Sequence, residues 1–354
     1  MTSLSRVART LKAEGSQVVF LTGAGTSVSA GIPDFRSQGG LYDTLRPELL
    51  TASPDQRAAM VSDPTQVVSW SMFSQNQFPY LEVRRPFILG IAEKKWRPTA
   101  THFFMRLCED KGKLKRVLTQ NIDGLDYQTG ISDGKIVSVH GSMGQITCEG
   151  CNASMDSSVF KSAVRTNIKD IYGVDGANGN ANAPRVSKEI LCEECGRPLV
   201  KPNTVLYGRS LPPAFFTAVE EDFPADGGMV NILFVAGTSL TVQPAASVPA
   251  HATASFRVVV DLHPVGGNMF DFASGEEENK RDIFLQGKCD EVFVDLAAEC
   301  GWLDELASFA QEMSESSRVL IGRKLEERSR GGEGGLGGGG DCGVGVELNM
   351  HNKE

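Results

Sequence analysis

The sequence lacks the features that send a chain into or across a membrane. Within its 354 residues there is no apolar run of about 18 residues, the length that a membrane-spanning helix requires. The N-terminus has no charged leader followed by a long apolar stretch, so a secretory signal is not supported. We therefore expect a soluble, intracellular protein with no membrane partner.

Basic residues are fewer than acidic residues in the sequence. The sequence has 35 Lys and Arg residues against 44 Asp and Glu residues, which gives a formal net charge of −9. Salt-sensitive binding to nucleic acid requires clustered Lys and Arg, so we expect no direct nucleic-acid partner. A cationic partner, such as a lysine-rich protein tail, would not be repelled. Nothing in the sequence indicates an oligomeric state.

The eight cysteines do not indicate a disulfide framework, because four of them form two tight pairs that suit a reducing compartment. The pairs are Cys148-x-x-Cys151 and Cys192-x-x-Cys195, and four such thiolates can close a tetrahedral shell around one Zn²⁺ ion. The 40 residues between the pairs exceed the usual spacing of about 15 to 20, but the entropy of loop closure grows only logarithmically with length. Four sulfur ligands leave no open position, so this zinc is expected to be structural. The alternative is a set of reduced, buried thiols.

A third glycine is missing from the dinucleotide-binding pattern. Gly23 and Gly25 follow the apolar, β-prone run 17–21, and a glycine turn there lets backbone N–H groups approach a pyrophosphate at the start of the next helix. Val28 holds the position of the third glycine, so the first two predict an ordinary turn more readily than a cofactor site. The next loop adds an acid, an aromatic ring and a base that a fold by itself does not require, and these are Asp34, Phe35 and Arg36.

Apolar, β-prone segments alternate with helix-like segments along most of the chain. The expected strands are residues 17–21, 114–118, 231–236 and 256–260, and residues 101–107 have a helical pattern. This alternation predicts an α/β fold with a doubly wound, mostly parallel, Rossmann-like sheet. Ligands of such sheets bind at the carboxyl ends of the strands.

Two insertions interrupt the alternation and are expected to form a smaller lobe. Residues 46–98 have helical periodicity and residues 148–201 carry the cysteine pairs, so the lobe combines helices with a zinc ribbon. Residues 322–354 contain a glycine-rich tract and are expected to be a disordered tail. The larger domain is then assembled from residues 1–45, 99–147 and 202–321.

Amide and carboxylate side chains follow the second expected strand. Gln120, Asn121 and Asp123 come directly after residues 114–118, where they could read a carboxamide or a ribose hydroxyl through complementary donors and acceptors. Asp123 could equally cap the N-terminus of a helix. The residues alone leave both interpretations open.

Three further segments have both a functional and a structural interpretation. His140 precedes Gly141, a small neighbour that leaves the imidazole accessible for proton exchange near neutral pH, although a lone histidine is more often structural. A second glycine turn, residues 237–244, offers hydroxyls to phosphate or ribose oxygens, or caps a helix. Residues 201–208 are extended and could pair with a peptide or form an ordinary edge strand.

Taken in order, these motifs resemble the sirtuin family of NAD-dependent protein lysine deacylases. The resemblance covers residues 5–320 and rests on the runs 23–37 and 119–123, His140-Gly141, the cysteine pairs, and residues 237–240 with Pro244. It implies that the larger domain binds NAD and that the acyl group of a lysine in a protein or peptide is transferred to ADP-ribose. Nicotinamide and free lysine would be released. Residues 103–112 look like the eukaryotic cytoplasmic and nuclear branch, which implies one or both of those locations.

The resemblance also implies roles for the motif residues. His140 helps to deprotonate a ribose hydroxyl, and Asn121 orients a ribose hydroxyl or a water molecule. Asp123 hydrogen-bonds the nicotinamide carboxamide, and Phe35 shields the reactive carbon from water. The residues expected to contact NAD are Gly23, Ala24, Gly25, Asp34, Phe35, Arg36, Gln120, Asn121, Ile122, Asp123, Gly237, Thr238, Ser239, Asp261 and Cys289, and those expected to contact the substrate are Val205, Tyr207 and Gly208.

The chain departs from the family pattern at two places. Asp261-Leu262-His263 stands where an Asn-x-Glu triplet is common, and Asp261 can still accept a hydrogen bond from a ribose hydroxyl. Tyr207-Gly208-Arg209 stands where Phe-Gly-Glu is common, so Arg209 removes an acid that would favour basic peptides. The Tyr and Arg of the desuccinylase branch are not placed by residues 70–78, and acetyl-lysine is the expected substrate.

Three other functions use parts of the same pattern. A module that senses NAD or ADP-ribose without turnover has no need of His140. An ADP-ribosyl transferase would pass ADP-ribose to a protein nucleophile, and the sequence leaves this open as a side activity. A zinc-ribbon nucleic-acid module requires basic residues around the cysteines, where this chain has Glu149, Glu193 and Glu194.

Overall fold

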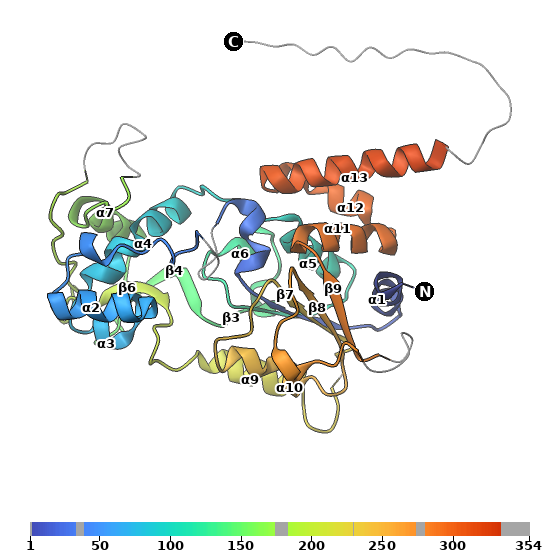
Figure 1. Cartoon of the computed structure of the whole chain (residues 1–354), viewed down its shortest axis with the longest axis horizontal. Helices are drawn as coiled ribbons and strands as arrows, with labels where there is room; N and C mark the ends of the chain where they lie inside the picture. The colour runs from blue at the N-terminus through green and yellow to red at the C-terminus, as the bar shows by residue number, and fades with distance from the viewer. Residues whose placement is uncertain (1, 33–38, 174–182, 229, 274–279, 334–354) are drawn as a thin grey trace, which may run out of the picture.

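A parallel sheet lies at the centre of the computed structural model, which describes residues 2–32, 39–173, 183–228, 230–273 and 280–333 (Figure 1). The six strands run in the order β3-β2-β1-β7-β8-β9, so the chain winds outward from β1 in one direction and then in the other. Their bounds are β1 Val18–Thr22, β2 Leu114–Thr119, β3 Ile136–Ser138, β7 Ile232–Ala236, β8 Phe256–Asp261 and β9 Asp282–Gln286. This is the doubly wound, Rossmann-like sheet that the alternation of segments predicts.

The strands are apolar along their whole length because both faces of the sheet are covered. All five residues of β1 are buried. Val18 and Phe20 pack in the core on one face of the sheet, whereas Val19 and Leu21 pack in the core on the other face. Successive strand side chains point to opposite faces, so a continuous apolar run feeds both cores.

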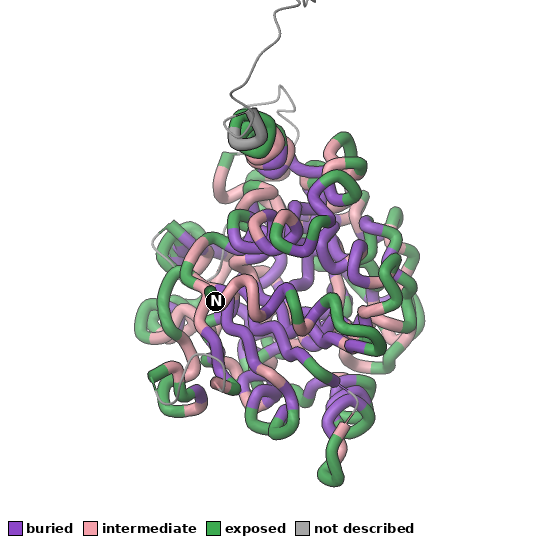
Figure 2. The backbone as a smooth tube through the Cα atoms, turned by 90° about the vertical axis from the view of Figure 1, so that its right-hand side faces the viewer, coloured by how far each residue is buried: buried purple, intermediate pink, exposed green. Residues whose placement is uncertain are grey.

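Helices cover the two faces of the sheet. One core joins the sheet to α1 Ser3–Lys12, α5 Ala100–Asp110, α11 Cys289–Cys300, α12 Leu303–Ser308 and α13 Glu315–Glu333 (Figure 1). The other core joins it to α9 Pro213–Asp222 and α10 Val248–His251, and the short α6 Leu125–Gln128 follows β2. Figure 2 shows that the buried backbone lies at the centre of the molecule and that the surrounding segments are exposed on their outer side. Within the described residues, none of the helices has the length and apolar character needed to span a bilayer.

The smaller lobe has a core of its own, to which both insertions contribute. Its helices are α2 Pro54–Ser62, α3 Trp70–Phe73, α4 Phe78–Ala92 and α7 Ser157–Asn167. Its antiparallel sheet has the order β5-β4-β6, with β5 Ser154–Met155, β4 Gly141–Cys148 and β6 Val200–Thr204. The expected boundaries at 147/148 and 201/202 therefore fall inside β4 and β6. These strands pair with each other rather than with the large sheet.

The four expected strands are confirmed to within one residue at each end. The short β3 and the polar-ended β9 were not among them. The helix expected after Gly25 is wrong, because two 3₁₀ turns follow β1, at Ala24–Thr26 and Val28–Ala30. Gly31, in the left-handed region at φ +83°, ends the second turn.

The disordered tail expected from residue 322 is wrong in its first part, because α13 continues to Glu333. Ile321 of this helix is buried in the core. Ion pairs of 2.6 Å then join Lys324 to Asp295 and Arg328 to Asp304, and these tie the helix to the domain below. The prediction for residues 334–354 lies outside the described residues.

Phenylalanines at the centre of the sheet are expected to be the most costly residues to truncate. Phe234 is fully buried, stacks on Phe20 at a centroid distance of 4.9 Å and meets Phe293 at 5.5 Å. Phe234→Ala should lower the free energy of unfolding by about 3–5 kcal/mol, because it leaves a cavity that such a core cannot refill. Urea unfolding followed by circular dichroism measures this loss. Val319→Ala, on the exposed side of α13, should change it by less than about 0.5 kcal/mol, and equal losses would contradict the assignment of the core.

Candidate active site

A cavity of about 820 Å³ lies between the strand ends of the large sheet and the smaller lobe. Its wall brings together most of the residues that the sequence singles out. Those lining it are Gly23, Ala24, Gly25, Gln120, Asn121, Ile122, His140, Val205, Tyr207, Gly208, Gly237, Thr238, Ser239, Asp261 and Cys289. Asp123 does not line it, and Asp34, Phe35 and Arg36 lie outside the described residues.

The two glycine turns pack backbone to backbone. Gly25 N–H donates to Gly237 O at 2.9 Å. A Cβ atom on Gly23 would lie 2.6 Å from Gly237 O, and one on Gly25 would lie 2.6 Å from Gly237 Cα. Gly237 itself has φ +60°. The turns after β1 and β7 approach so closely that these positions must be glycine. Together the two turns form a continuous backbone floor under the cavity.

The Asn121 amide is held from behind. Its Nδ2 donates to Gly23 O and Thr26 Oγ1, each at 3.1 Å, and lies 3.3 Å from Ser27 Oγ. Its backbone N–H donates to Thr119 Oγ1 at 3.2 Å. Among the described residues no donor reaches Oδ1, so the acceptor end of the amide is left for a ligand.

His140 has one ring nitrogen engaged and one available. Nδ1 lies 3.0 Å from Gln120 O, a carbonyl that can only accept, so the neutral ring carries its proton on Nδ1. Nε2 then bears the lone pair, and it is buried without a partner in the part of the chain that the structure describes. Burial lowers the pKa of His140 below its ordinary value of 6.5, and the contact with Gln120 O opposes this shift. The ring is therefore a neutral proton acceptor at pH 7.

Asp123 supports the site from behind the cavity wall. Its carboxylate accepts from Ser27 Oγ at 2.7 Å and from Leu125 N–H at 2.9 Å. Burial raises the pKa of Asp123. The N-cap of α6 is Gly124 and has no side-chain cap, so Asp123 is not the capping residue; its contact with Leu125 N–H is a local turn in front of the helix.

A buried histidine lies beside this carboxylate. His102, Asp123 and Asp126 bring ligand-type atoms within 4.8 Å of one another. His102 Nδ1 lies 2.8 Å from Thr99 Oγ1 and 3.2 Å from the Thr99 backbone nitrogen, and Nε2 lies 4.0 Å from Asp126 Oδ1. Burial lowers the pKa of His102 and raises the pKa of Asp126 to about 6. This buried group lies under the loop after β2.

The remaining residues expected to contact the nucleotide lie around the second glycine turn. Gln120 Nε2 donates to Thr238 Oγ1 at 2.9 Å and thereby joins the turns after β2 and β7. Asp261 ends β8, with burial raising the pKa of its carboxyl, and Cys289 begins α11. Ser239 Oγ lies 3.0 Å from Thr241 Oγ1. Hydroxyl, carboxylate and amide groups thus line one end of the cavity.

The expected substrate segment continues from β6 along the opposite wall. Val205 N–H donates to His140 O at 2.8 Å. Tyr207 N–H donates to Val68 O at 3.0 Å, and Trp70 N–H donates to Tyr207 O at 2.9 Å. This edge of the segment is therefore already paired. Because strand groups alternate in direction, an added peptide strand is expected at the other edge, where Leu206 N–H lies and where Leu206 O accepts from Arg209 N–H at 3.0 Å.

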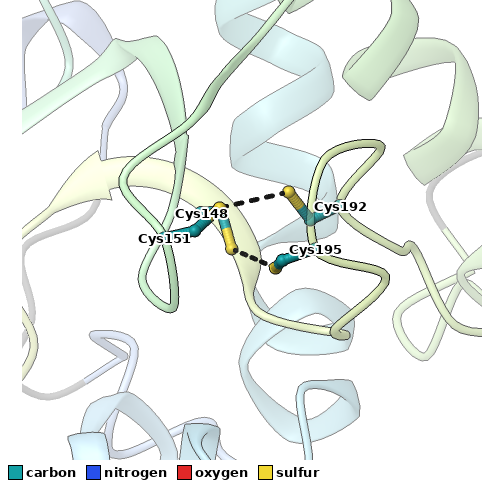
Figure 3. Close-up of side chains that lie close together, drawn as sticks. All are labelled: Cys148, Cys151, Cys192 and Cys195. Carbon is teal, nitrogen blue, oxygen red and sulfur yellow. Dashed lines mark hydrogen bonds between the residues drawn. The ribbon is translucent and has the colours of Figure 1, made fainter.

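The four cysteines of the two Cys-x-x-Cys pairs converge on one another, as Figure 3 shows, and none of them lines the cavity. Their Sγ atoms all lie within 4.8 Å of one another, with Cys148 to Cys195 at 3.7 Å and Cys151 to Cys192 at 3.6 Å. These separations are too long for disulfides. A tetrahedron with Zn–S bonds of about 2.3 Å places its sulfurs about 3.8 Å apart. The donor set therefore fits a closed, structural zinc site.

Comparisons with known proteins place this site in a family. The sequence profile of the Sir2 family matches residues 23–244. The chain belongs to the Sir2 family. It is 30% identical over 334 residues to the "NAD-dependent protein deacetylase sirtuin-2" of Danio rerio, covering 91% of this chain and 77% of that protein. It is 32% identical over 295 residues to the "NAD-dependent deacetylase sir2A" of Dictyostelium discoideum, covering 83% of this chain and half of that protein.

A solved structure supports the same assignment for this Sir2-family chain. It is described as "Structural Basis for the Mechanism and Regulation of Sir2 Enzymes" and is 27% identical, with a TM-score of 0.59. The match covers 85% of this chain and 98% of the solved one. The fold is therefore shared over nearly the whole of that protein.

Several residues that line the cavity of this Sir2-family chain are not predicted by the sequence motifs. Tyr80 and Arg84 of α4 line it, although α4 belongs to the insertion whose apolar periodicity predicts only a packed helix. Lys288 lines it from the N-cap of α11. The one signal for Arg84 in the sequence is the pair Arg84-Arg85 inside an otherwise apolar segment.

Removal of one cysteine should release the zinc. Cys195→Ser replaces a thiolate with a hydroxyl that Zn²⁺ binds poorly, so the purified protein should contain far less than one zinc per chain. Elemental analysis by mass spectrometry measures the content. Cys300→Ala, which removes a buried thiol of α11 outside the cluster, should keep one zinc per chain. Full zinc content in Cys195→Ser would contradict the four-sulfur site.

Proposed function

We infer that this chain is an NAD-dependent protein lysine deacetylase, which transfers the acetyl group of a lysine to ADP-ribose and releases nicotinamide and free lysine. The observation that carries this proposal is that His140 and Asn121 line the same cavity, with His140 Nε2 buried and unpartnered within the described residues. A site that only bound a nucleotide would have no need of a neutral, buried imidazole lone pair. The relatives named as NAD-dependent deacetylases support the reaction class.

When bound, NAD supplies the ribose carbon that nicotinamide leaves and that the acyl oxygen attacks. The chain's own residues position the nucleotide and remove a proton from a ribose hydroxyl. The backbone floor at Gly23 and Gly237 admits the nucleotide closely, and Asn121 Oδ1 accepts a hydrogen bond from a ribose hydroxyl or a water molecule. His140 Nε2 takes the proton from a ribose hydroxyl, while Gln120 O holds the Nδ1 proton and so stabilises the imidazolium that forms.

The other motif residues take supporting roles in this proposal. Asp261 accepts from the adenosine ribose, and Cys289 lies on the adenine side. Asp123 accepts from the nicotinamide carboxamide if its carboxylate turns from Ser27 toward the cavity. Asp34, Phe35 and Arg36 remain predicted contacts of NAD. For the substrate, Val205, Tyr207 and Gly208 carry the acyl-lysine chain past His140, and the cytoplasm or nucleus is the proposed location.

The chemistry is tested by incubating the protein with NAD and acetyl-, succinyl- or myristoyl-lysine peptides. The wild-type protein should form nicotinamide and O-acetyl-ADP-ribose in equal amounts, quantified by mass spectrometry. His140→Ala should lower kcat/KM by about 10²- to 10⁴-fold, because the base is gone, and His140→Tyr should do the same. Both variants should keep the far-ultraviolet circular dichroism of the wild type.

His251→Ala, on the exposed surface of α10, is the matched control and should keep full activity. Wild-type activity in His140→Ala would defeat the proposal. NAD binding without nicotinamide release would favour a sensor module. ADP-ribose attached to the peptide would favour a transferase.

The pH dependence follows from the lowered pKa of His140. The base acts in its neutral form, so kcat/KM should be level above about pH 7 and fall as His140 is protonated at lower pH. Because burial depresses this pKa, the midpoint of the fall should lie below the ordinary value of 6.5. A kcat/KM profile measured from pH 5 to 8.5 locates it. A midpoint above 6.5 would show that the acidic form of His140 is stabilised instead.

A further inference from the structure

A fixed cation stands at the rim of the cavity beside the proposed substrate segment. Arg209 lines the cavity, and its guanidinium carbon lies 3.9 Å from the centroid of the Trp70 ring. Arg209 Nη2 also donates to Glu149 Oε2 at 3.0 Å. An arginine held both by an aromatic face and by a carboxylate loses little further freedom when it meets a ligand.

The charge of this cation is only partly compensated. Glu149 is shared, because its Oε1 lies 2.8 Å from Nζ of Lys201, which is fully buried. Lys201 Nζ also donates to Thr204 O at 2.6 Å. Two cations therefore share one carboxylate, which leaves one positive charge in the group formed by Glu149, Lys201 and Arg209. Lys201 is inside the protein, so Arg209 is the member that presents this charge to a ligand.

Cations also outnumber carboxylates in the lining of the cavity. Among the described residues that line it, the cations are Arg84, Arg209 and Lys288, and the one carboxylate is Asp261; Lys288 lies 3.9 Å from Glu291, outside the lining. This stands against a net charge of −9 for the chain. Charges of one sign inside a cleft concentrate the electric field at its mouth, so the cavity attracts anions although the protein as a whole repels them.

We propose that Arg209 makes this enzyme prefer protein segments with Asp or Glu next to the acyl-lysine. The proposal rests on the function inferred above and adds the substrate class. A lysine that enters beside Val205 and Tyr207 brings its neighbours along the rim, and residues of an extended peptide follow one another at about 3.3 Å. The neighbours then lie within reach of Arg209, two residues beyond Tyr207. Basic neighbours would meet the same charge and be repelled.

Two acetyl-lysine peptides of equal length test this, one with Asp on both sides of the lysine and one with Lys on both sides. At low ionic strength the wild-type enzyme should have a kcat/KM about fivefold or more higher for the acidic peptide. The ratio should shrink in 0.5 M NaCl, because the rim is exposed to solvent. Arg209→Gln should bring the ratio near one, Arg209→Glu should reverse it, and Arg209→Lys should keep its direction.

Arg323→Gln, on the exposed side of α13, is the matched control, since it removes the same charge away from the cavity and should leave the ratio unchanged. A wild-type ratio of one, or a preference for the basic peptide, would overturn the proposal. So would an equal fall for both peptides in Arg209→Gln, because Arg209 would then only hold the segment in place. Failure to release nicotinamide from either peptide would instead defeat the proposed function itself.

Discussion

The site depends on the contact between two glycine turns at the ends of β1 and β7. Gly25 and Gly237 approach so closely that a Cβ atom on either would lie within 2.8 Å of the other turn's backbone. No side chain fits into such a contact. The two strand ends can therefore meet only because both positions are glycine. Their meeting lets Asn121 reach Gly23 O and lets Gln120 reach Thr238. The contact between the two glycine turns therefore determines both the floor of the cavity and the orientation of its polar side chains.

The side chains of Asn121 and His140 are each held through atoms other than those proposed to act on NAD. Asn121 is fixed through Nδ2 and its backbone N–H, and His140 is fixed through Nδ1, which leaves Oδ1 and Nε2 toward the cavity. A buried polar atom without a partner costs free energy, so a protein keeps one where a ligand will complete it. The Gln120 carbonyl contacts His140 Nδ1, and Gln120 directly precedes Asn121. One short loop therefore fixes the orientation of both side chains.

The metal site and the substrate wall are connected through one carboxylate. Glu149 lies inside the first cysteine pair, yet its two oxygens contact Lys201 and Arg209, on either side of the segment that lines the cavity. Trp70 completes this link, since it carries Arg209 on its ring and pairs its backbone with Tyr207. A structural zinc that orders the cysteine loops would thus also order the rim beside the proposed substrate segment.

The sequence by itself determined what depends on near neighbours in the chain. The buried strands could be predicted because a strand covered on both faces must be apolar throughout, and the paired cysteines because two ligands three residues apart already form half of a metal shell. The helix expected after Gly25 was wrong because the turn there packs against Gly237. The tail expected from residue 322 was wrong as far as Glu333, because Lys324 and Arg328 form ion pairs with Asp295 and Asp304. Only the tertiary structure decided that Arg84 faces the cavity and that Arg209 shares Glu149 with Lys201. Such contacts join residues distant in the chain, and a periodicity or a motif does not encode the topology that brings them together.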